Sequence, residues 1–100
     1  MPVYMIVEVT IHDPEVYSEY VARIPEAVKK YDGRYIVRGG PVTPLTGDWT
    51  PERIIVLEFP SAERMWAWNA SPEYAELAPL RMHSTTTRAI LVEGYRGGDE

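Results

Sequence analysis

The stretch from Glu52 to Arg81 constrains the fold more than any other part of this chain. It opens with an apolar run of strand length, Arg53 to Phe59, and breaks at Pro60. Ser61 is a good helix N-cap, so a helix should follow the strand at once, and we expect it to extend through Trp68. This strand-to-helix unit predicts mixed α and β structure.

A second helix start follows within the same stretch. Ser71 is again an N-cap, Pro72 suits the first helical position, and Pro79 should interrupt the helix after a turn or two. Trp66 and Trp68 lie two residues apart, so they cannot share one helical face. We expect one of them to pack in the core.

The N-terminal third of the chain predicts one strand and one long helix. Apolar residues alternate from Val3 to Ile11, and Asp13 then provides a helix N-cap. Apolar residues next recur at steps of three and four, which indicates a helix from Pro14 to about Tyr31. Pro25 lies inside this helix, where it should kink the backbone and free the carbonyl of Val21.

Two further strands complete the predicted topology. Gly33 should end the long helix, a strand follows from Arg34 to Arg38, and the last strand runs from Thr87 to Gly94. The order β-α-β-β-α-β is typical of the ferredoxin-like α+β fold, a four-stranded antiparallel sheet with both helices on one face. We expect one domain over residues 1–95 and a loose C-terminal tail over residues 96–100.

Such a fold leaves one face of the sheet without helices. If Val3, Met5 and Val7 face the helices, strand parity places mostly apolar residues on the open face. They are Tyr4, Ile6 and Glu8 from the first strand, Ile36 and Arg38 from the second, Ile54, Val56 and Glu58 from the third, and Ala89, Leu91 and Glu93 from the fourth. An apolar face of that size should be covered, and we predict a homodimer that packs sheet to sheet.

Few ionisable residues form a catalytic pattern. Glu8, Glu58 and Glu93, gathered near Arg38, would suit acid–base chemistry, but we favour their pairing with arginines or with a neighbouring strand. His83 is the candidate for proton transfer.

Composition and charge exclude several classes of site and partner. The chain has no cysteine, which excludes disulfides, thiolate metal sites and cysteine nucleophiles, and neither histidine lies in a metal-ligand spacing. We therefore expect no cofactor and no metal. A net charge of −5 argues against a nucleic-acid partner. No apolar run approaches the roughly 20 residues that span a bilayer, so we expect no membrane partner and a cytoplasmic location.

Four segments of the chain carry a family resemblance. They are DPEVYSEY in the first helix, GRYIVRGG at the second strand, GDWTPERIIVLEFPS through the third strand and WNASPEYAELAPLR after it. They resemble the bacterial domain-of-unknown-function family thirteen-thirty, in the dimeric α/β-barrel superfamily, and the resemblance extends from Tyr4 to Gly94. It implies a ferredoxin-like protomer whose sheet faces that of a second copy. Relatives in the superfamily include cofactor-free monooxygenases, muconolactone isomerases and haem-degrading enzymes, and several have a pocket between helices and sheet.

Our leading hypothesis is therefore a homodimer that binds a small aromatic or carboxylated metabolite. The aromatic side chains would sandwich an apolar body, and an arginine would hold a carboxylate. The ligand-binding residues we predict are Tyr20, Arg38, Trp49, Trp68, Tyr74 and Arg81. Pairing of Arg81 with an acidic neighbour such as Glu58 is an equally good interpretation.

Two other functions stay open at this point. One is a non-catalytic dimeric module without a ligand, in which the aromatic residues only pack. The other is a tautomerase-like enzyme in which removal of Met1 would expose Pro2 as a general base, although we favour an ordinary leader residue there. The residues alone do not decide whether the protein is an enzyme.

Overall fold

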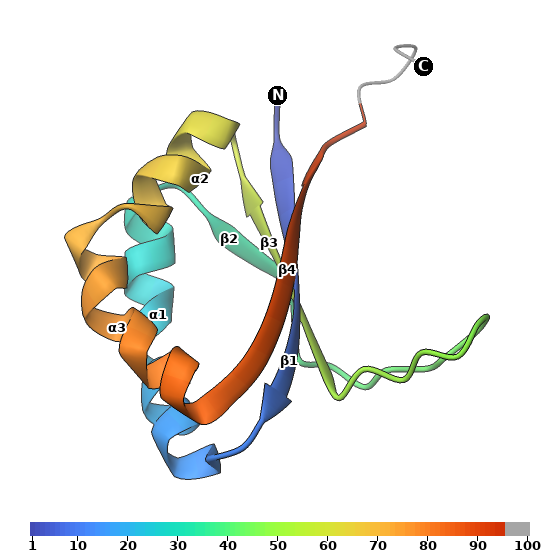
Figure 1. The fold of residues 1–100 in the computed structure, drawn as a ribbon. Helices are drawn as coiled ribbons and strands as arrows, with labels where there is room; N and C mark the ends of the chain where they lie inside the picture. Colours follow the sequence, from blue (N-terminus) through green and yellow to red (C-terminus); the bar gives the residue numbers. More distant parts are fainter. Residues whose placement is uncertain (96–100) are drawn as a thin grey trace.

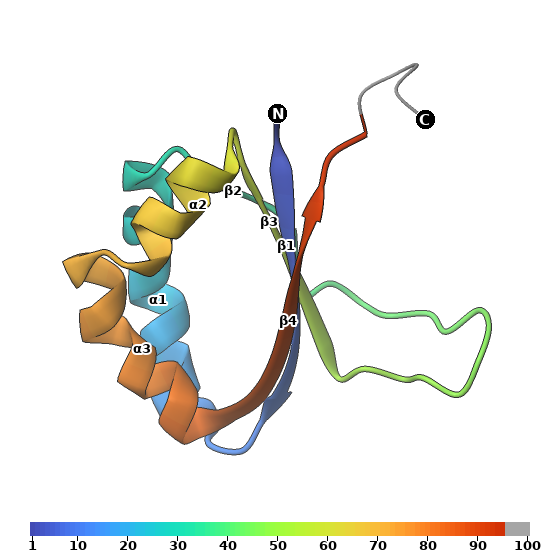
Figure 2. The same cartoon turned by 45° about the horizontal axis from the view of Figure 1, so that its top comes forward.

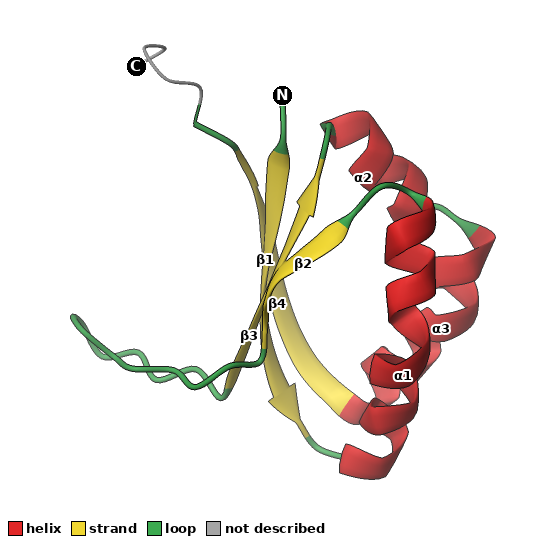
Figure 3. Cartoon of the chain, turned by 180° about the vertical axis from the view of Figure 1, so that it is seen from behind, coloured by secondary structure: helices red, strands yellow, loops and turns green. Residues whose placement is uncertain are grey.

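Four antiparallel strands and three helices make up residues 1–95, the part of the chain that this computed structural model describes (Figure 1). Their bounds are β1 (Val3–Ile11), α1 (Pro14–Lys30), β2 (Arg34–Arg38), β3 (Arg53–Phe59), α2 (Ala62–Asn69), α3 (Pro72–Ser84) and β4 (Thr85–Glu93). The sheet order is β2-β3-β1-β4, and all three helices lie on one face of the sheet (Figure 3). The ferredoxin-like α+β prediction is confirmed. The predicted loose tail, residues 96–100, lies outside the described residues.

Each helix begins at the N-cap that the sequence predicts. The caps are Asp13 for α1, Ser61 for α2 and Ser71 for α3. Each side chain accepts a hydrogen bond from the backbone N–H three residues later, at 3.1–3.2 Å. These bonds satisfy N–H groups that have no partner inside the helix. None of the helices in residues 1–95 is long and apolar enough to cross a membrane.

The helix α3 is longer than predicted. It continues through Pro79 to Ser84, so the expectation that Pro79 would interrupt it was wrong. Leu77 on one side of the proline and Ser84 on the other are both buried. Tertiary packing therefore holds the helix together where the proline removes one of its hydrogen bonds.

The end of α1 also differs in detail from the prediction. The helix ends at Lys30, and the left-handed residue that follows is Asp32, with φ of 65°, and not Gly33. Glycine is needed at position 33 for a different reason, which is close packing. A Cβ at that position would lie 2.6 Å from the Phe59 ring.

The hydrophobic core lies between the helices and the sheet. Phe59 is fully enclosed, and Trp68 is only 2% exposed. The Trp68 ring centroid lies 5.5 Å from that of Phe59 and 4.4 Å from that of Tyr74. Trp66, by contrast, is 59% exposed. The prediction that one of these two tryptophans packs in the core is therefore confirmed.

The register of β4 reverses its predicted faces. Ala89 lies opposite Val7 of β1, and the same register places Leu91 opposite Met5 and Glu93 opposite Val3. Directly opposed residues share a face of the sheet, so Ala89, Leu91 and Glu93 face the helices, and placing them on the open face was wrong.

An irregularity in β2 likewise changes the side on which a predicted residue lies. The pairing register with β3 shifts between Tyr35 and Val37, which leaves one residue of β2 unpaired. Arg38 then lies opposite the buried Ile55, on the side of the helices. Its assignment to the open face was wrong because the irregularity breaks the two-residue alternation on which that assignment rested.

The open face carries an apolar row between two ion pairs. Val37, Val56, Ile6 and Ile90 lie side by side across the four strands. Arg34 lies 2.5 Å from Glu58 on one side of this row, and Arg88 lies 2.5 Å from Glu8 on the other. For Glu8 and Glu58, the prediction of pairing with arginines is confirmed. Glu93 lies on the other face, so the three glutamates do not form one cluster.

A long loop, residues 39–52, joins β2 to β3. Figures 1, 2 and 3 all show it projecting from the sheet on the side opposite the helices. We refer to it as the β2–β3 arm.

Candidate ligand cavity

A cavity of about 310 Å³ lies between the sheet and the helices. Every strand and every helix of residues 1–95 contributes to its wall. Its aromatic lining residues are Tyr17, Tyr20, Tyr35, Trp68 and Tyr74, and its cationic ones are Arg38, Arg53 and Arg81. The volume is at the lower end of the range that small-molecule sites occupy.

The three arginines of the cavity have no acidic partner in residues 1–95. The described lining of the cavity contains no carboxylate. The other arginines of residues 1–95 are Arg23, Arg34, Arg64 and Arg88, and each of them forms an ion pair. The arginines of residues 1–95 that lack an ion pair are therefore concentrated at the cavity, where no described carboxylate compensates their charge.

Arg38 is held in position by the carbonyl that Pro25 frees. Because Pro25 has no N–H, the carbonyl of Val21 lacks its helical partner. Nη2 of Arg38 donates to that oxygen at 2.6 Å, and the guanidinium lies 4.5 Å from the centroid of the Tyr35 ring. The predicted effect of Pro25 on Val21 is confirmed. One of the five guanidinium N–H donors is engaged in this bond, and the others are available.

Arg53 and Arg81 are each oriented by a tyrosine. Nε of Arg53 donates to the Tyr17 hydroxyl, and Nη2 of Arg81 donates to the Tyr74 hydroxyl, both at 3.2 Å. Gly39, with φ of 75°, leaves room for Arg53, since a Cβ at that position would collide with the guanidinium. Arg81 does not pair with Glu58, which binds Arg34 on the other face, so that interpretation of Arg81 was wrong.

Two tyrosine hydroxyls of the cavity have no hydrogen-bond partner in the described part of the chain. They belong to Tyr20 and Tyr35, and both residues line the cavity. Burial raises the pKa of Tyr20, and the nearby Tyr74 and Tyr35 raise it further. Burial also raises the pKa of Tyr35 to about 12. Both hydroxyls therefore stay protonated at neutral pH and can donate a hydrogen bond to a ligand.

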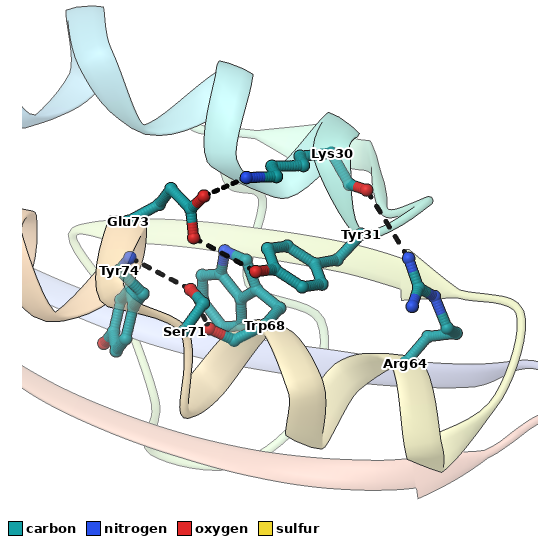
Figure 4. A network of polar contacts seen from close by, with 7 residues as sticks. All are labelled: Lys30, Tyr31, Arg64, Trp68, Ser71, Glu73 and Tyr74. Atoms are coloured by element: carbon teal, nitrogen blue, oxygen red, sulfur yellow. Dashed lines mark hydrogen bonds and ion pairs between the residues drawn. The ribbon is translucent and has the colours of Figure 1, made fainter.

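A polar network braces the wall that carries Trp68 (Figure 4). Glu73 of α3 accepts from the Tyr31 hydroxyl at 3.0 Å and forms an ion pair with Lys30 at the end of α1. The Ser71 hydroxyl donates to the carbonyl of Trp68 at 2.6 Å. These contacts tie α1, α2 and α3 together beside the indole. Nε1 of Trp68 itself is buried without a hydrogen-bond partner in residues 1–95.

The structure brings five of the six predicted ligand-binding residues to this cavity. Tyr20, Arg38, Trp68, Tyr74 and Arg81 all line it. The sixth residue lies elsewhere.

Trp49 lies on the opposite side of the sheet. Its Nε1 donates to Oε2 of Glu8 at 3.1 Å, on the open face. The assignment of Trp49 to the pocket wall was wrong because the β2–β3 arm leaves the sheet on the side away from the helices.

The predicted proton-transfer candidates do not reach the cavity. His83 is exposed near the end of α3 and is absent from the described lining. Pro2 is exposed at the start of β1 and is also absent from it. Residues 1–95 contain no group of three or more side chains that could hold a metal ion.

Among the aromatic and cationic residues of the lining, three went unpredicted, namely Tyr17, Tyr35 and Arg53. Arg53 precedes the buried Ile55 by two residues, so strand parity was enough to place it on the helix side. Tyr17 lies on the apolar face of the predicted first helix. Tyr35 had no comparable signal, since the irregularity in β2 obscures the parity of that strand.

Comparison with known proteins supports the fold and identifies a family match. A family model described as a domain of unknown function, DUF1330, matches residues 2–95. No curated protein matches the chain significantly.

Three solved structures illustrate what the chain is similar to. A protein of unknown function from Rhodopseudomonas palustris, RPA0582, superposes with a TM-score of 0.81 at 18% identity, over 95% of this chain and 83% of that one. A dimeric ferredoxin-like protein of unknown function from Jannaschia sp. CCS1 gives 0.72 at 12% identity, over 94% and 100%. SnoaB, a cofactor-independent oxygenase from Streptomyces nogalater, gives 0.66 at 14%, over 99% and 98%. At these identities the likeness is one of fold.

Proposed function

Because the chain belongs to the DUF1330 family, whose description assigns no function, we propose one from the cavity: the protein binds a small aromatic carboxylic acid. The observation that carries this proposal is a set of three arginines that have no acidic partner within residues 1–95 and lie at an aromatic-lined cavity whose described lining contains no carboxylate.

The chemistry of the lining favours a carboxylate over other ligand groups. A guanidinium presents parallel N–H donors that match the two oxygens of a carboxylate, and such charge-assisted bonds are stronger than neutral ones. Arg38, Arg53 and Arg81 each make one of the described hydrogen bonds within the protein, which leaves further donors on every guanidinium. A bound anion would compensate their charge.

The rest of the lining favours an aromatic body. Tyr20, Tyr35, Tyr74 and Trp68 supply ring faces and edges around an apolar floor formed by the sheet. Rings of this kind pack well against a flat ligand. The hydroxyls of Tyr20 and Tyr35 can donate to a polar substituent on the ligand.

We propose binding and not proton abstraction as the role of the cavity. The described lining contains no histidine, lysine or carboxylate. Its raised-pKa tyrosines, Tyr20 and Tyr35, are protonated at neutral pH and so act there as donors and not as bases. A cofactor-independent oxygenase shares the fold, but this set of groups is better suited to holding an acid than to deprotonating one.

We further propose that the functional unit is a homodimer packed through the open face. That face carries the apolar row of Val37, Val56, Ile6 and Ile90, and burying this row against a second copy would remove apolar surface from water. The flanking Glu8 and Glu58 already form ion pairs with arginines. A similar fold from Jannaschia sp. CCS1 is described as dimeric. A sedimentation velocity measurement at micromolar concentration should give twice the mass of the chain, and a stable monomer would contradict this part of the proposal.

Ligand binding can be tested with matched pairs of small molecules. Benzoate, salicylate and phenylacetate should raise the melting temperature and give calorimetric binding curves, whereas benzamide and benzyl alcohol should not. Arg38→Met and Arg81→Met should each weaken carboxylate binding by about 10- to 100-fold, because a hydrogen bond to a charged group contributes roughly 1.5–3 kcal/mol.

The matched control is Arg23→Met, which removes an exposed, ion-paired arginine outside the cavity and should leave affinity unchanged. Equal binding of benzoate and benzamide, or affinity that does not respond to either cavity substitution, would refute the proposal.

A further inference from the structure

The β2–β3 arm is the part of the chain that the fold and the cavity do not explain. Residues 39–52 leave the sheet on the side of the open face, as the three ribbon views agree (Figures 1, 2 and 3). No residue of the arm lines the cavity. It is also longer than an ordinary hairpin connection, which takes two to five residues.

The base of the arm is fixed to the sheet. The backbone N–H of Gly39 donates to the Ile54 carbonyl at 2.9 Å, and the N–H of Ile11 donates to Oε2 of Glu52 at 2.8 Å. Trp49 is held by its bond to Glu8 on the open face. These contacts set the direction in which the arm projects.

The distal part of the arm exposes large apolar side chains. Leu45 is 91% exposed, the highest value among the exposed large apolar residues, and Val42 is also exposed. Pro41 and Pro44 immediately precede Val42 and Leu45 and restrict the backbone there, so ordering this part against a surface costs less conformational entropy than ordering a flexible loop. Asp48 is the only charged residue between Gly39 and Pro51.

We propose that the arm clasps a second copy of this chain, with Leu45 packed against the partner beyond the edge of its sheet. This inference rests on the homodimer part of the proposed function. Two sheets packed face to face lie about 10 Å apart. Each limb of the arm has about seven residues and reaches up to roughly 25 Å when extended. An arm of that reach cannot be accommodated in the gap between the sheets, so in the dimer it passes alongside the partner.

The second copy is the occupant that the observations favour. The arm rises from the same face that carries the apolar row, so whatever covers that row also meets the arm. Its large exposed side chains, Val42, Leu45 and Trp49, are apolar, which suits a permanent contact with protein better than a charged or nucleic-acid surface.

Leu45→Asp tests the clasp without touching the core or the cavity. We expect the dimer dissociation constant, measured by sedimentation equilibrium, to rise at least 10-fold. The matched control is Met82→Asp, since Met82 is also a large exposed apolar residue, 66% exposed, but lies on α3 in the helical layer. It should leave the dissociation constant unchanged.

A second measurement uses the absence of cysteine from the chain. A photoreactive label on Leu45→Cys should cross-link one copy to the other, while the same label on Met82→Cys should not. If the unmodified protein is a monomer, the homodimer proposal fails and the clasp fails with it. If it is a dimer whose dissociation constant is unchanged by Leu45→Asp and whose label gives no cross-link, the clasp alone is refuted.

Discussion

The link between Pro25 and Arg38 makes a prediction that a double-mutant cycle can measure. In the native protein, Nη2 of Arg38 is the donor to the Val21 carbonyl, at 2.6 Å, because Pro25 supplies no N–H. In a Pro25→Ala variant the N–H of the new alanine would reach the same oxygen through the ordinary helical bond. Arg38→Met should therefore cost more stability when residue 25 is proline than when it is alanine.

The magnitude follows from the type of bond and its exposure. A hydrogen bond with a charged partner contributes roughly 1.5–3 kcal/mol, and solvent reduces this because Arg38 is exposed. We expect Arg38→Met to lower the free energy of unfolding by about 1 kcal/mol beside Pro25 and by about half as much in the Pro25→Ala background. Arg38→Met also removes the contact between the guanidinium and the Tyr35 ring. Because this loss occurs in both backgrounds, it cancels when the two stability costs are subtracted.

The assay is urea unfolding of all four proteins at one protein concentration, followed by circular dichroism. Pro25→Ala alone should stabilise the protein, since an interior proline is unfavourable in a helix. If Arg38→Met costs the same in both backgrounds, within roughly the 0.3 kcal/mol expected of independent sites, the proposed dependence of Arg38 on Pro25 is refuted.

Three further predictions concern the core and the ionisable groups. Gly33→Ala should destabilise the protein by about 1–3 kcal/mol in thermal or urea unfolding, because its Cβ would lie 2.6 Å from the Phe59 ring, and a gain in stability would contradict this. The raised pKa of Tyr35 means that its contribution to stability is present below pH 10.0 and is lost as pH rises toward about 12. When phenolate absorbance is followed as pH rises, Tyr35→Phe should accordingly remove one ionisation at the high-pH end of the curve. An unchanged curve would contradict the raised pKa of the buried Tyr35 hydroxyl. The Arg34 hydrogen bond lowers the pKa of Glu58, so that stability from this pair is present above pH 4.5 and is lost as pH falls through the lowered value. Glu58→Gln should flatten the acid side of the stability profile, and an unaltered slope would show that the pair contributes nothing.

Local sequence signals predicted the elements and the residues that start them. Asp13, Ser61 and Ser71 cap the three helices because a capping side chain acts on the backbone three residues later, which is a purely local interaction. The effect of Pro25 on Val21 was predictable for the same reason, since the missing N–H and the freed carbonyl lie on one helix.

The cavity was predictable in part. Tyr20, Trp68, Tyr74 and Arg81 were identified from the concentration of aromatic and basic residues on predicted helices, and all four line the cavity. Their roles in ligand binding remain a proposal. The sequence did not show which arginines lack an acidic partner, because ion pairs such as those of Arg34 and Arg88 form between strands that are distant in sequence.

The sequence by itself determined which segments are strands and helices and where each helix begins, because these depend on neighbours a few residues away. The tertiary structure decided the rest. Strand alternation defines two faces but does not say which one meets the helices, so the side of Ala89 was set by pairing with β1. A single unpaired residue in β2 moved Arg38 to the cavity, and the direction of the arm removed Trp49 from it.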